Sequence, residues 1–256
     1  MYGGDHLLGA SRLDGGVIRD KLKLSILYPA FNEEQNVKNI PVELLPYIEK
    51  LGIPYEVIII DDGSKDNTLN EAIKLKIKYP VIRVLKHKKN MGLGAAVKTG
   101  IKNAKGELLV TIDGDFTFHP RQIKDLFKRF QKGDVDCVIG SPTLKGYGKD
   151  VPSYRIFLSK SVNLLYNILL GKRITAVSPI FRLYKTRQLK KLKIQANGFD
   201  INAEILFRLL EKNRIVTEIP ARLTTRKFGE SKLNNVKEIK NHIKLLLRIL
   251  SWKIKG

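Results

Sequence analysis

Two stretches of sequence decide the fold: EVIIIDDGS at residues 56–64 and LLVTIDGD at residues 108–115. Each begins with a short apolar run rich in β-branched residues, which is typical of a strand buried on both faces of a parallel sheet. Each ends in an acidic turn, and parallel sheets place their ligand sites at the carboxyl ends of the strands. Both acidic pairs are therefore expected on one rim, an arrangement suited to a nucleotide and a divalent metal. The carboxylates concerned are Asp61, Asp62, Asp113 and Asp115.

Strand and helix patterns alternate on both sides of these stretches. This order predicts an α/β fold, a Rossmann-like, mostly parallel sheet with helices on both faces. The expected strands are residues 24–28, 55–60, 81–86, 108–112 and 136–139, and the helices between them are residues 33–51, 68–78, 94–104 and 120–131. Beyond residue 140 we expect helices at 155–170, 201–211 and 236–255, a short strand at 181–184 and an edge strand at 215–220.

The composition is that of a globular protein with an unusual charge. Its 256 residues are 43% apolar and 28% charged, but 47 Lys and Arg against 25 Asp and Glu give a net charge of +22. Such a chain attracts anionic partners: nucleic acid, acidic lipid or phosphorylated substrates. Charge alone favours nucleic acid. However, Lys is spread along most of the helices, whereas nucleic-acid grooves gather basic and aromatic residues together.

Targeting and redox signals are few. Cys137 is the lone cysteine, so no intramolecular disulfide forms, and its place in an expected strand predicts a buried, inert thiol. Residues 1–20 contain no apolar core typical of a signal peptide, and no apolar run approaches the 18 residues of a membrane span. We therefore expect any membrane contact to be peripheral, at the cytoplasmic face.

The helix expected at 236–255 is basic and amphipathic. One apolar stripe is widened by Leu245, Ile249 and Trp252, and Lys and Arg residues lie opposite. Two interpretations are open: a membrane-surface helix, or a helix docked on the sheet with a solvated polar face. The stripe consists of Ile239, Ile243, Leu246, Leu247, Leu250 and Ile254.

The turn at Asp113 and Asp115 is the candidate metal site. Paired carboxylates suit Mg²⁺ or Mn²⁺, which bind hard oxygen ligands together with substrate phosphates. Asp134 and Asp136 form a similar pair, but they precede their strand, which predicts a solvated turn at the opposite rim. Asp61 and Asp62 are candidates for contacts to a base or ribose. The glycine-rich segment at residues 90–96 opens a helix, for which a tight, closely packed turn is favoured over phosphate contact.

Five motifs in a fixed order resemble a known family. They are PAFNE at 29–33, DDGS at 61–64, NMGLGAA at 90–96, DGD at 113–115 and, later, FRLY at 181–184 with RKFGESKL at 226–233. The first four closely resemble the family 2 inverting glycosyltransferases with the GT-A fold. The last resembles the dolichyl- and polyprenyl-phosphate sugar synthases, the dolichol-phosphate mannose synthase-like branch. We expect a flexible tail at 1–22, a GT-A domain at 23–233, which the resemblance implies, and a basic amphipathic membrane-surface helix at 234–256.

The resemblance also assigns roles by position. Asp113 and Asp115 would hold the donor diphosphate through Mg²⁺ or Mn²⁺ and, with Arg226, form the catalytic set. The implied nucleotide-sugar residues are Pro29, Phe31, Glu33, Asp61, Asp62, Gly92, Asp113, Gly114 and Asp115. The implied acceptor-phosphate residues are Arg155, Ser159, Arg182, Arg226, Ser231 and Lys232.

This chain departs from the family pattern at three places. Thr117 replaces a common metal-binding Gln, Pro142 replaces an Arg, and AVSPIFR at 176–182 replaces a run that usually contains Asp and Thr-Ser-Gly. A pseudoenzyme that keeps the nucleotide pocket is one interpretation of these departures.

The implied activity is transfer of a sugar, with mannose favoured over glucose, from GDP-mannose or UDP-glucose to dolichyl or polyprenyl phosphate at an anionic membrane. A phosphate acceptor is largely ionised at neutral pH and needs no general base, and the sequence contains no obvious histidine base. The alternatives are a hydroxyl acceptor such as a polysaccharide and, with less support, nucleic-acid binding. A membrane partner subunit is possible.

Overall fold

A computed structural model describes residues 23–145, 153–226, 228 and 235–255. Its centre is a seven-stranded sheet in the order β3-β2-β1-β4-β6-β5-β7. The sheet is parallel apart from β6, which runs antiparallel to β4 and β5. The strands are β1 (Leu24–Ala30), β2 (Tyr55–Asp61), β3 (Ile82–Lys86), β4 (Leu108–Thr111), β5 (Cys137–Ser141), β6 (Arg182–Lys185) and β7 (Val216–Pro220).

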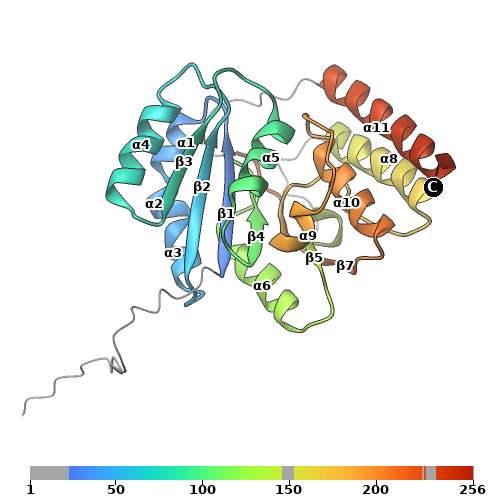
Figure 1. The fold of residues 1–256 in the computed structure, drawn as a ribbon, viewed down its shortest axis with the longest axis horizontal. Coiled ribbons are helices and arrows are strands. Elements are labelled where there is room, and N and C mark those ends of the chain that lie inside the picture. Colours follow the sequence, from blue (N-terminus) through green and yellow to red (C-terminus); the bar gives the residue numbers. More distant parts are fainter. Residues whose placement is uncertain (1–22, 146–152, 227, 229–234, 256) are drawn as a thin grey trace, which may run out of the picture.

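Helices cover both faces of the sheet, as predicted (Figure 1). Alternate residues of one strand supply two separate cores: Ile58 packs with α5, while Ile59 packs with the helices of the other face. Cys137 is fully buried in the first core, as expected. The longer helices are α4 (Thr68–Lys78), α5 (Leu93–Asn103), α6 (Ile123–Gln131), α8 (Ser153–Leu170), α10 (Ile201–Glu211) and α11 (Asn235–Lys255).

The single helix expected at residues 33–51 is wrong. The structure has three short helices there, α1 (Glu34–Lys38), α2 (Ile40–Glu43) and α3 (Leu45–Glu49). Pro41 and Pro46 each lie in the first turn of a new helix, where the missing N–H costs nothing but a continuous helix could not pass. The sequence patterns also missed α7 (Pro142–Lys145) and α9 (Thr186–Lys190), while the short helix η1 (Pro120–Gln122) opens the helix expected at 120–131.

The strand order identifies the functional rim. The chain builds β1, β2 and β3 outward in one direction and then returns to place β4 on the other side of β1. This reversal is a topological switch point, beside which open α/β sheets bind their ligands. Residues 29–33, 61–64 and 113–115 all lie at or just beyond the carboxyl ends of β1, β2 and β4. The predicted common rim is therefore confirmed.

Helices α8 and α11 lie side by side at the end of the molecule away from β3 (Figure 1). They are joined by a hydrogen bond of 3.0 Å between the Tyr166 hydroxyl and His242 Nδ1. No helix within the described part of the chain is both long and apolar enough to cross a bilayer.

One side of α11 is docked on the core of the protein, and a membrane contact through its other side stays a prediction. Leu245 and Ile249 are fully buried against the core, and Trp252 stacks on Phe207 with ring centroids 5.6 Å apart. The other side is exposed, and the neighbouring face of α8 is exposed too, with Phe157 and Ile168 each 70% accessible. The exposed residues of this apolar end surface are Tyr154, Phe157, Leu164, Leu165 and Ile168 of α8, and Ile239, Ile243, Leu247 and Leu250 of α11.

Candidate active site

A cavity of about 890 Å³ lies at the switch-point rim. Every residue that the resemblance assigned to the nucleotide sugar, with the exception of Asp61, lines it, and Arg226 does as well. The predicted residues in the wall are Pro29, Phe31, Glu33, Asp62, Gly92, Asp113, Gly114, Asp115 and Arg226.

The acidic turn after β4 is held in place by its neighbours. The Thr117 hydroxyl lies 3.4 Å from Asp113 Oδ2, and the Thr117 amide donates to Asp115 Oδ1 at 3.1 Å. The Tyr28 hydroxyl donates to the carbonyl of Gly114 at 2.5 Å. A side chain at Gly114 would place its Cβ 2.5 Å from the carbonyl oxygen of Pro29, so the close approach of the turn to β1 requires glycine.

Asp113 and Asp115 fit a divalent metal. Burial and, secondly, the charge of Asp115 raise the pKa of Asp113 well above its usual value, so a cation between the two carboxylates would stabilise the ionised pair. Among the described residues, no group of three or more His, Cys, Asp and Glu side chains could hold a metal. Two carboxylates nevertheless suffice for Mg²⁺ or Mn²⁺ when substrate phosphates and water complete the shell. Thr117, which replaces the usual Gln, here orients the two carboxylates.

Arg226 joins the acidic turn to the first motif. Its Nη2 lies 2.6 Å from Asp115 Oδ2, and its Nη1 lies 3.7 Å from Glu33 Oε1. Three residues predicted from separate motifs therefore meet in the cavity. The arrangement places one permanent positive charge beside the carboxylates predicted to bind a metal, where it can also contact an anionic ligand.

Asp62 contacts the glycine-rich turn. Its carboxylate accepts hydrogen bonds from the amides of Met91 at 3.0 Å and Gly92 at 2.8 Å, and His87 Nδ1 lies 2.6 Å from Oδ1. Most of its acceptor positions are therefore already used in fixing the turn. Asp61 is buried behind the wall of the cavity and is 3.3 Å from the Ser64 amide. A base or ribose contact stays a prediction for both residues.

The glycine-rich turn itself packs closely, which was the favoured interpretation of residues 90–96. A Cβ at Gly92 would lie 2.4 Å from the carbonyl oxygen of Asn197, and a Cβ at Gly94 would lie 2.6 Å from its carbonyl carbon. The amide of Gly94 donates to that same carbonyl oxygen at 2.8 Å. The Gly94 N–H lies in the first turn of α5 and has no acceptor within the helix. It is hydrogen-bonded to the protein's own backbone instead.

The similar acidic pair lies at the opposite rim, as predicted. Asp136 comes just before β5, forms an ion pair of 3.0 Å with Lys185 and accepts the amide of Ile215 at 3.1 Å. Its role is to join three chain segments. Asp134 has a positive φ of 59° in the turn that precedes it.

The prediction that Arg182 binds the acceptor phosphate is wrong for this structure. The side chain, which belongs to β6, is fully buried and donates to four backbone carbonyls. Its partners are Pro179 at 2.8 Å, Asn202 at 2.8 Å, and Val177 and Ala176 at 2.5 and 3.2 Å. Arg182 therefore connects residues 176–179 to α10, and a phosphate cannot reach it.

The remaining acceptor predictions lie outside what the structure describes. Ser231 and Lys232 fall in an undescribed stretch, and the side chains of Arg155 and Ser159 are not described although the backbone of α8 is. These four assignments stay predictions.

The far wall of the cavity was not predicted. It consists of residues 195–200, between α9 and α10, together with residues of α11. These positions contain no acidic pair or glycine motif that follows a strand, so the local sequence gives no sign that they belong to a ligand site. They reach the rim only when the chain folds. The α11 residues in the wall are Glu238, Asn241, Lys244, Leu247 and Arg248.

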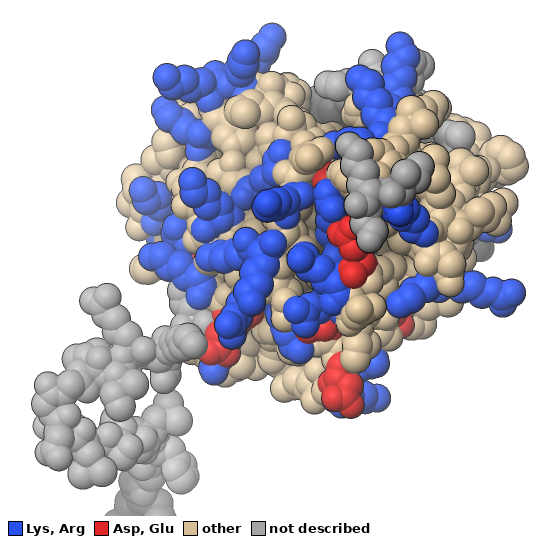
Figure 2. All heavy atoms as spheres, turned by 45° about the vertical axis from the view of Figure 1, so that its right-hand side comes forward, with Lys and Arg blue, Asp and Glu red and all other residues tan. Residues whose placement is uncertain are grey.

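The cavity reaches the apolar end surface. Leu247 lines the cavity and is also 61% exposed on the outer stripe of α11. Lys244, one turn away on the same helix, is exposed and lines the cavity too. Figure 2 shows Lys and Arg side chains spread over the visible face, with only a few acidic side chains between them.

Comparison with known proteins agrees with this geometry. Residues 25–193 match the model of glycosyl transferase family 2. The chain is 33% identical over 238 residues to a dolichol-phosphate mannosyltransferase of Pyrococcus furiosus, covering 91% of this chain and 65% of that protein. This chain thus spans slightly less than two thirds of that relative. It is 30% identical over 261 residues to a dolichyl-phosphate beta-glucosyltransferase of Dictyostelium discoideum, covering 93% of this chain and 78% of the relative.

A solved structure has the same fold. Glucosyl-3-phosphoglycerate synthase from Mycobacterium tuberculosis, in complex with Mn²⁺, uridine diphosphate and phosphoglyceric acid, superposes with a TM-score of 0.67. The match covers 90% of this chain and 77% of that one at 19% identity. At this identity the likeness concerns the fold alone, and it agrees with the predicted GT-A architecture.

Proposed function

Because this chain belongs to glycosyl transferase family 2, we propose that it is an inverting glycosyltransferase that moves a hexose from a nucleotide sugar to dolichyl or polyprenyl phosphate at a membrane surface. Mannose from GDP-mannose is the favoured donor sugar and glucose from UDP-glucose the next. Both sugars occur in the names of relatives that are 33% and 30% identical to this chain over the aligned residues.

One observation supports this proposal above the others. A single cavity extends from the carboxylates of Asp113 and Asp115 to Leu247, which belongs to the exposed apolar stripe of α11. A nucleotide diphosphate suits the first end, where a metal and Arg226 can meet its charge. A phosphate on a long hydrocarbon chain suits the second end, because its chain would remain against apolar surface while its phosphate enters the cavity.

The chemistry requires little of the protein beyond binding and charge. When bound, Mg²⁺ or Mn²⁺ would be held by Asp113 and Asp115 and would supply positive charge beside the donor diphosphate. Arg226 stabilises the negative charge that develops on the leaving nucleoside diphosphate. The acceptor phosphate is already ionised, so its oxygen can attack the anomeric carbon from the opposite side, with inversion, once both substrates are bound.

The apolar end surface supports action at a membrane. Its exposed side chains come from two adjacent helices, and α8 contains no acidic residue. Basic residues beside it, such as Lys240 and Lys244, favour anionic lipid headgroups. A peripheral protein bound through this surface presents the mouth of its cavity to the lipid phase, and we propose that this is the orientation in which the acceptor is bound.

A hydroxyl acceptor is the second candidate, and Asp200 favours it. This carboxylate is 3% exposed and lines the cavity, and burial raises its pKa, as suits a general base. Transfer to a polyprenyl phosphate and to the corresponding polyprenol, compared in the same vesicles, separates the two candidates. The proposal predicts product from the phosphate alone.

A donor screen tests the first half of the proposal. Thermal unfolding is followed with GDP-mannose, UDP-glucose and UDP-N-acetylglucosamine, each with and without Mn²⁺. A ligand that binds only the folded protein raises the unfolding midpoint, and we expect a shift that needs both nucleotide sugar and metal. If no nucleotide sugar shifts the midpoint at millimolar concentration, the donor assignment is wrong. A shift without any transfer would instead identify a pseudoenzyme.

A further inference from the structure

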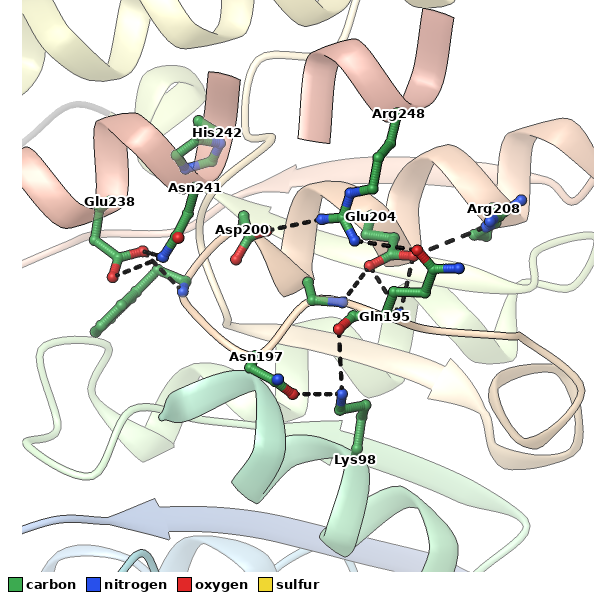
Figure 3. Close-up of polar contacts among 12 residues, drawn as sticks. Lys98, Gln195, Asn197, Asp200, Glu204, Arg208, Glu238, Asn241, His242 and Arg248 are labelled. Atoms are coloured by element: carbon green, nitrogen blue, oxygen red, sulfur yellow. Dashed lines mark hydrogen bonds and ion pairs between the residues drawn. The ribbon is translucent and has the colours of Figure 1, made fainter. Parts of the chain in front are cut away.

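We propose that Glu238 and Arg248 are positioning residues of the donor pocket, through which α11 holds the pocket wall formed by residues 195–200. The inference rests on the proposed function, because the ligand concerned is its nucleotide sugar. Its consequence is that nucleotide affinity depends on α11, the helix whose outer stripe belongs to the apolar end surface. Figure 3 shows the polar contacts that join these elements.

Residues 195–200 contact the floor of the cavity on one side. The carbonyl of Asn197 accepts the amide of Gly94, and its side-chain oxygen accepts Lys98 Nζ at 2.6 Å. Both donors belong to α5, directly behind the glycine-rich turn that Asp62 fixes. Any displacement of residues 195–200 would therefore also change the packing against that turn.

The inner end of the segment is anchored by Glu204. This carboxylate is fully buried, and it accepts the amides of Gln195 at 3.1 Å and Ala196 at 2.6 Å. Glu204, which belongs to α10, contacts only these first residues of the segment. The other end, near Phe199, is held by different hydrogen bonds.

Helix α11 supplies a second anchor. Glu238 Oε2 accepts the amide of Phe199 at 3.0 Å. One turn after Lys244, Arg248 donates to Gln195 Oε1 at 3.3 Å and pairs with Asp200 Oδ2 at 3.4 Å (Figure 3). All three partners line the cavity. Polar side chains of α11 thus contact both ends of the segment.

Gly198 shows how closely α11 covers the segment. A Cβ at this position would lie 2.5 Å from Asn241 Nδ2 and 3.1 Å from Glu238 Oε2. Side chains of α11 therefore occupy the space that any larger residue would need. The glycine allows direct contact between the helix and the wall of the cavity.

The same helix presents Ile239, Ile243 and Leu247 outward. A bilayer that binds this stripe fixes α11, and α11 in turn fixes Phe199 and Asp200. In the absence of a bilayer, α11 itself is held less firmly, so loss of its contacts with the segment should weaken nucleotide binding most in the lipid-free protein.

The experiment measures the dissociation constants of GDP and UDP with Mn²⁺ by calorimetry, with and without phosphatidylcholine–phosphatidylglycerol vesicles. We expect Glu238→Ala and Arg248→Met to weaken binding of the preferred nucleotide about tenfold without vesicles, as expected for loss of a hydrogen bond to a charged group. Vesicles should restore part of the loss. Glu238→Gln, which can still accept the Phe199 amide, should retain most of the affinity, whereas a merely destabilised fold would not distinguish Gln from Ala.

Lys76→Met is the control, since Lys76 is exposed on α4, away from the apolar end surface, and its replacement removes the same charge as Arg248→Met. Hydrogen exchange at the Phe199 amide gives a second measurement, which should speed up in Glu238→Ala while the β1 amides stay protected. The inference is overturned if Glu238→Ala and Arg248→Met bind nucleotide as tightly as Lys76→Met and Phe199 exchange is unchanged. If the wild-type protein binds neither nucleotide, the proposed function fails, and the inference fails with it.

Discussion

Arg226 Nη2 lies 2.6 Å from Asp115 Oδ2, although the two residues are 111 positions apart in the chain. The ion pair connects the motif after β7 to the acidic turn after β4. It means that, without a nucleotide, the arginine already interacts with one of the carboxylates that a metal would use. Arg226 and a bound cation would therefore interact with the same carboxylate, and a bound diphosphate would offer the arginine another anionic partner.

Replacement of Arg226 tests this relationship. Arg226→Met should lower kcat about 100-fold, because a positive charge beside the leaving diphosphate is lost. In nucleotide-free protein the same variant should bind Mn²⁺ more tightly than wild type, since Asp115 no longer pairs with the arginine. Steady-state kinetics and Mn²⁺ titration followed by electron paramagnetic resonance measure the two effects. Arg222→Met, at an exposed neighbouring position, is the control; equal turnover in both variants would remove Arg226 from the mechanism.

Gly94 tests the close packing of the glycine-rich turn. Its Cα lacks space for a Cβ because the backbone of Asn197 lies 2.6 Å from that position. Gly94→Ala should lower the free energy of unfolding by about 1–3 kcal/mol, the usual cost of overpacking, and weaken nucleotide binding as well. Urea denaturation and calorimetry measure these effects. Gly133→Ala is the control, since Gly133 has open space around it and does not line the cavity. Any loss of stability in this variant should come only from the positive φ of residue 133, and nucleotide binding should stay intact.

Much of this site could be predicted because its residues follow strand ends. The rim at residues 61–64 and 113–115 depends only on strand polarity, and the structure confirms it. Arg182 shows the limit of prediction. Its position in a motif suggested that it binds a phosphate, but its side chain is buried and donates hydrogen bonds to four backbone carbonyls. Residues 195–200 could not be predicted at all, because their proximity to the rim depends on how α10 and α11 pack.

Replacing two leucines of α11 tests protein stability and membrane binding independently. Leu245 is fully buried, whereas Leu247 is 61% exposed. Leu245→Ala should lower the free energy of unfolding by about 2–5 kcal/mol. Leu247→Ala should change it little, but should weaken binding to anionic vesicles about tenfold, since the side chain would be buried by lipid. Urea denaturation and vesicle sedimentation measure the two effects. Unchanged sedimentation of Leu247→Ala and of Ile243→Ala would argue against the apolar end surface as the membrane contact.

His242 should make stability depend on pH. Burial lowers its pKa from 6.5 to about 4, so the folded protein keeps it neutral while the unfolded chain protonates it. Because the unfolded state binds more protons below pH 6.5, stability falls as the pH drops from there toward 4, with a loss of about 2 kcal/mol by pH 5. Urea denaturation of wild type and His242→Gln at pH 7.5 and pH 5 measures this difference. An identical pH dependence in both proteins would contradict the assignment.

Transfer of a radiolabelled sugar to a lipid phosphate tests both the acceptor and the need for Asp115. Radiolabelled GDP-mannose or UDP-glucose is incubated with Mn²⁺ and vesicles that contain polyprenyl phosphate, and the product is partitioned into organic solvent. For wild type we expect label in the organic phase, and for Asp115→Ala at least about a 1,000-fold lower rate with an intact fold. Near-normal turnover by Asp115→Ala with saturating metal would contradict a role of Asp115 in transfer, and label that stays entirely in the aqueous phase with the wild-type protein would exclude the lipid phosphate as acceptor.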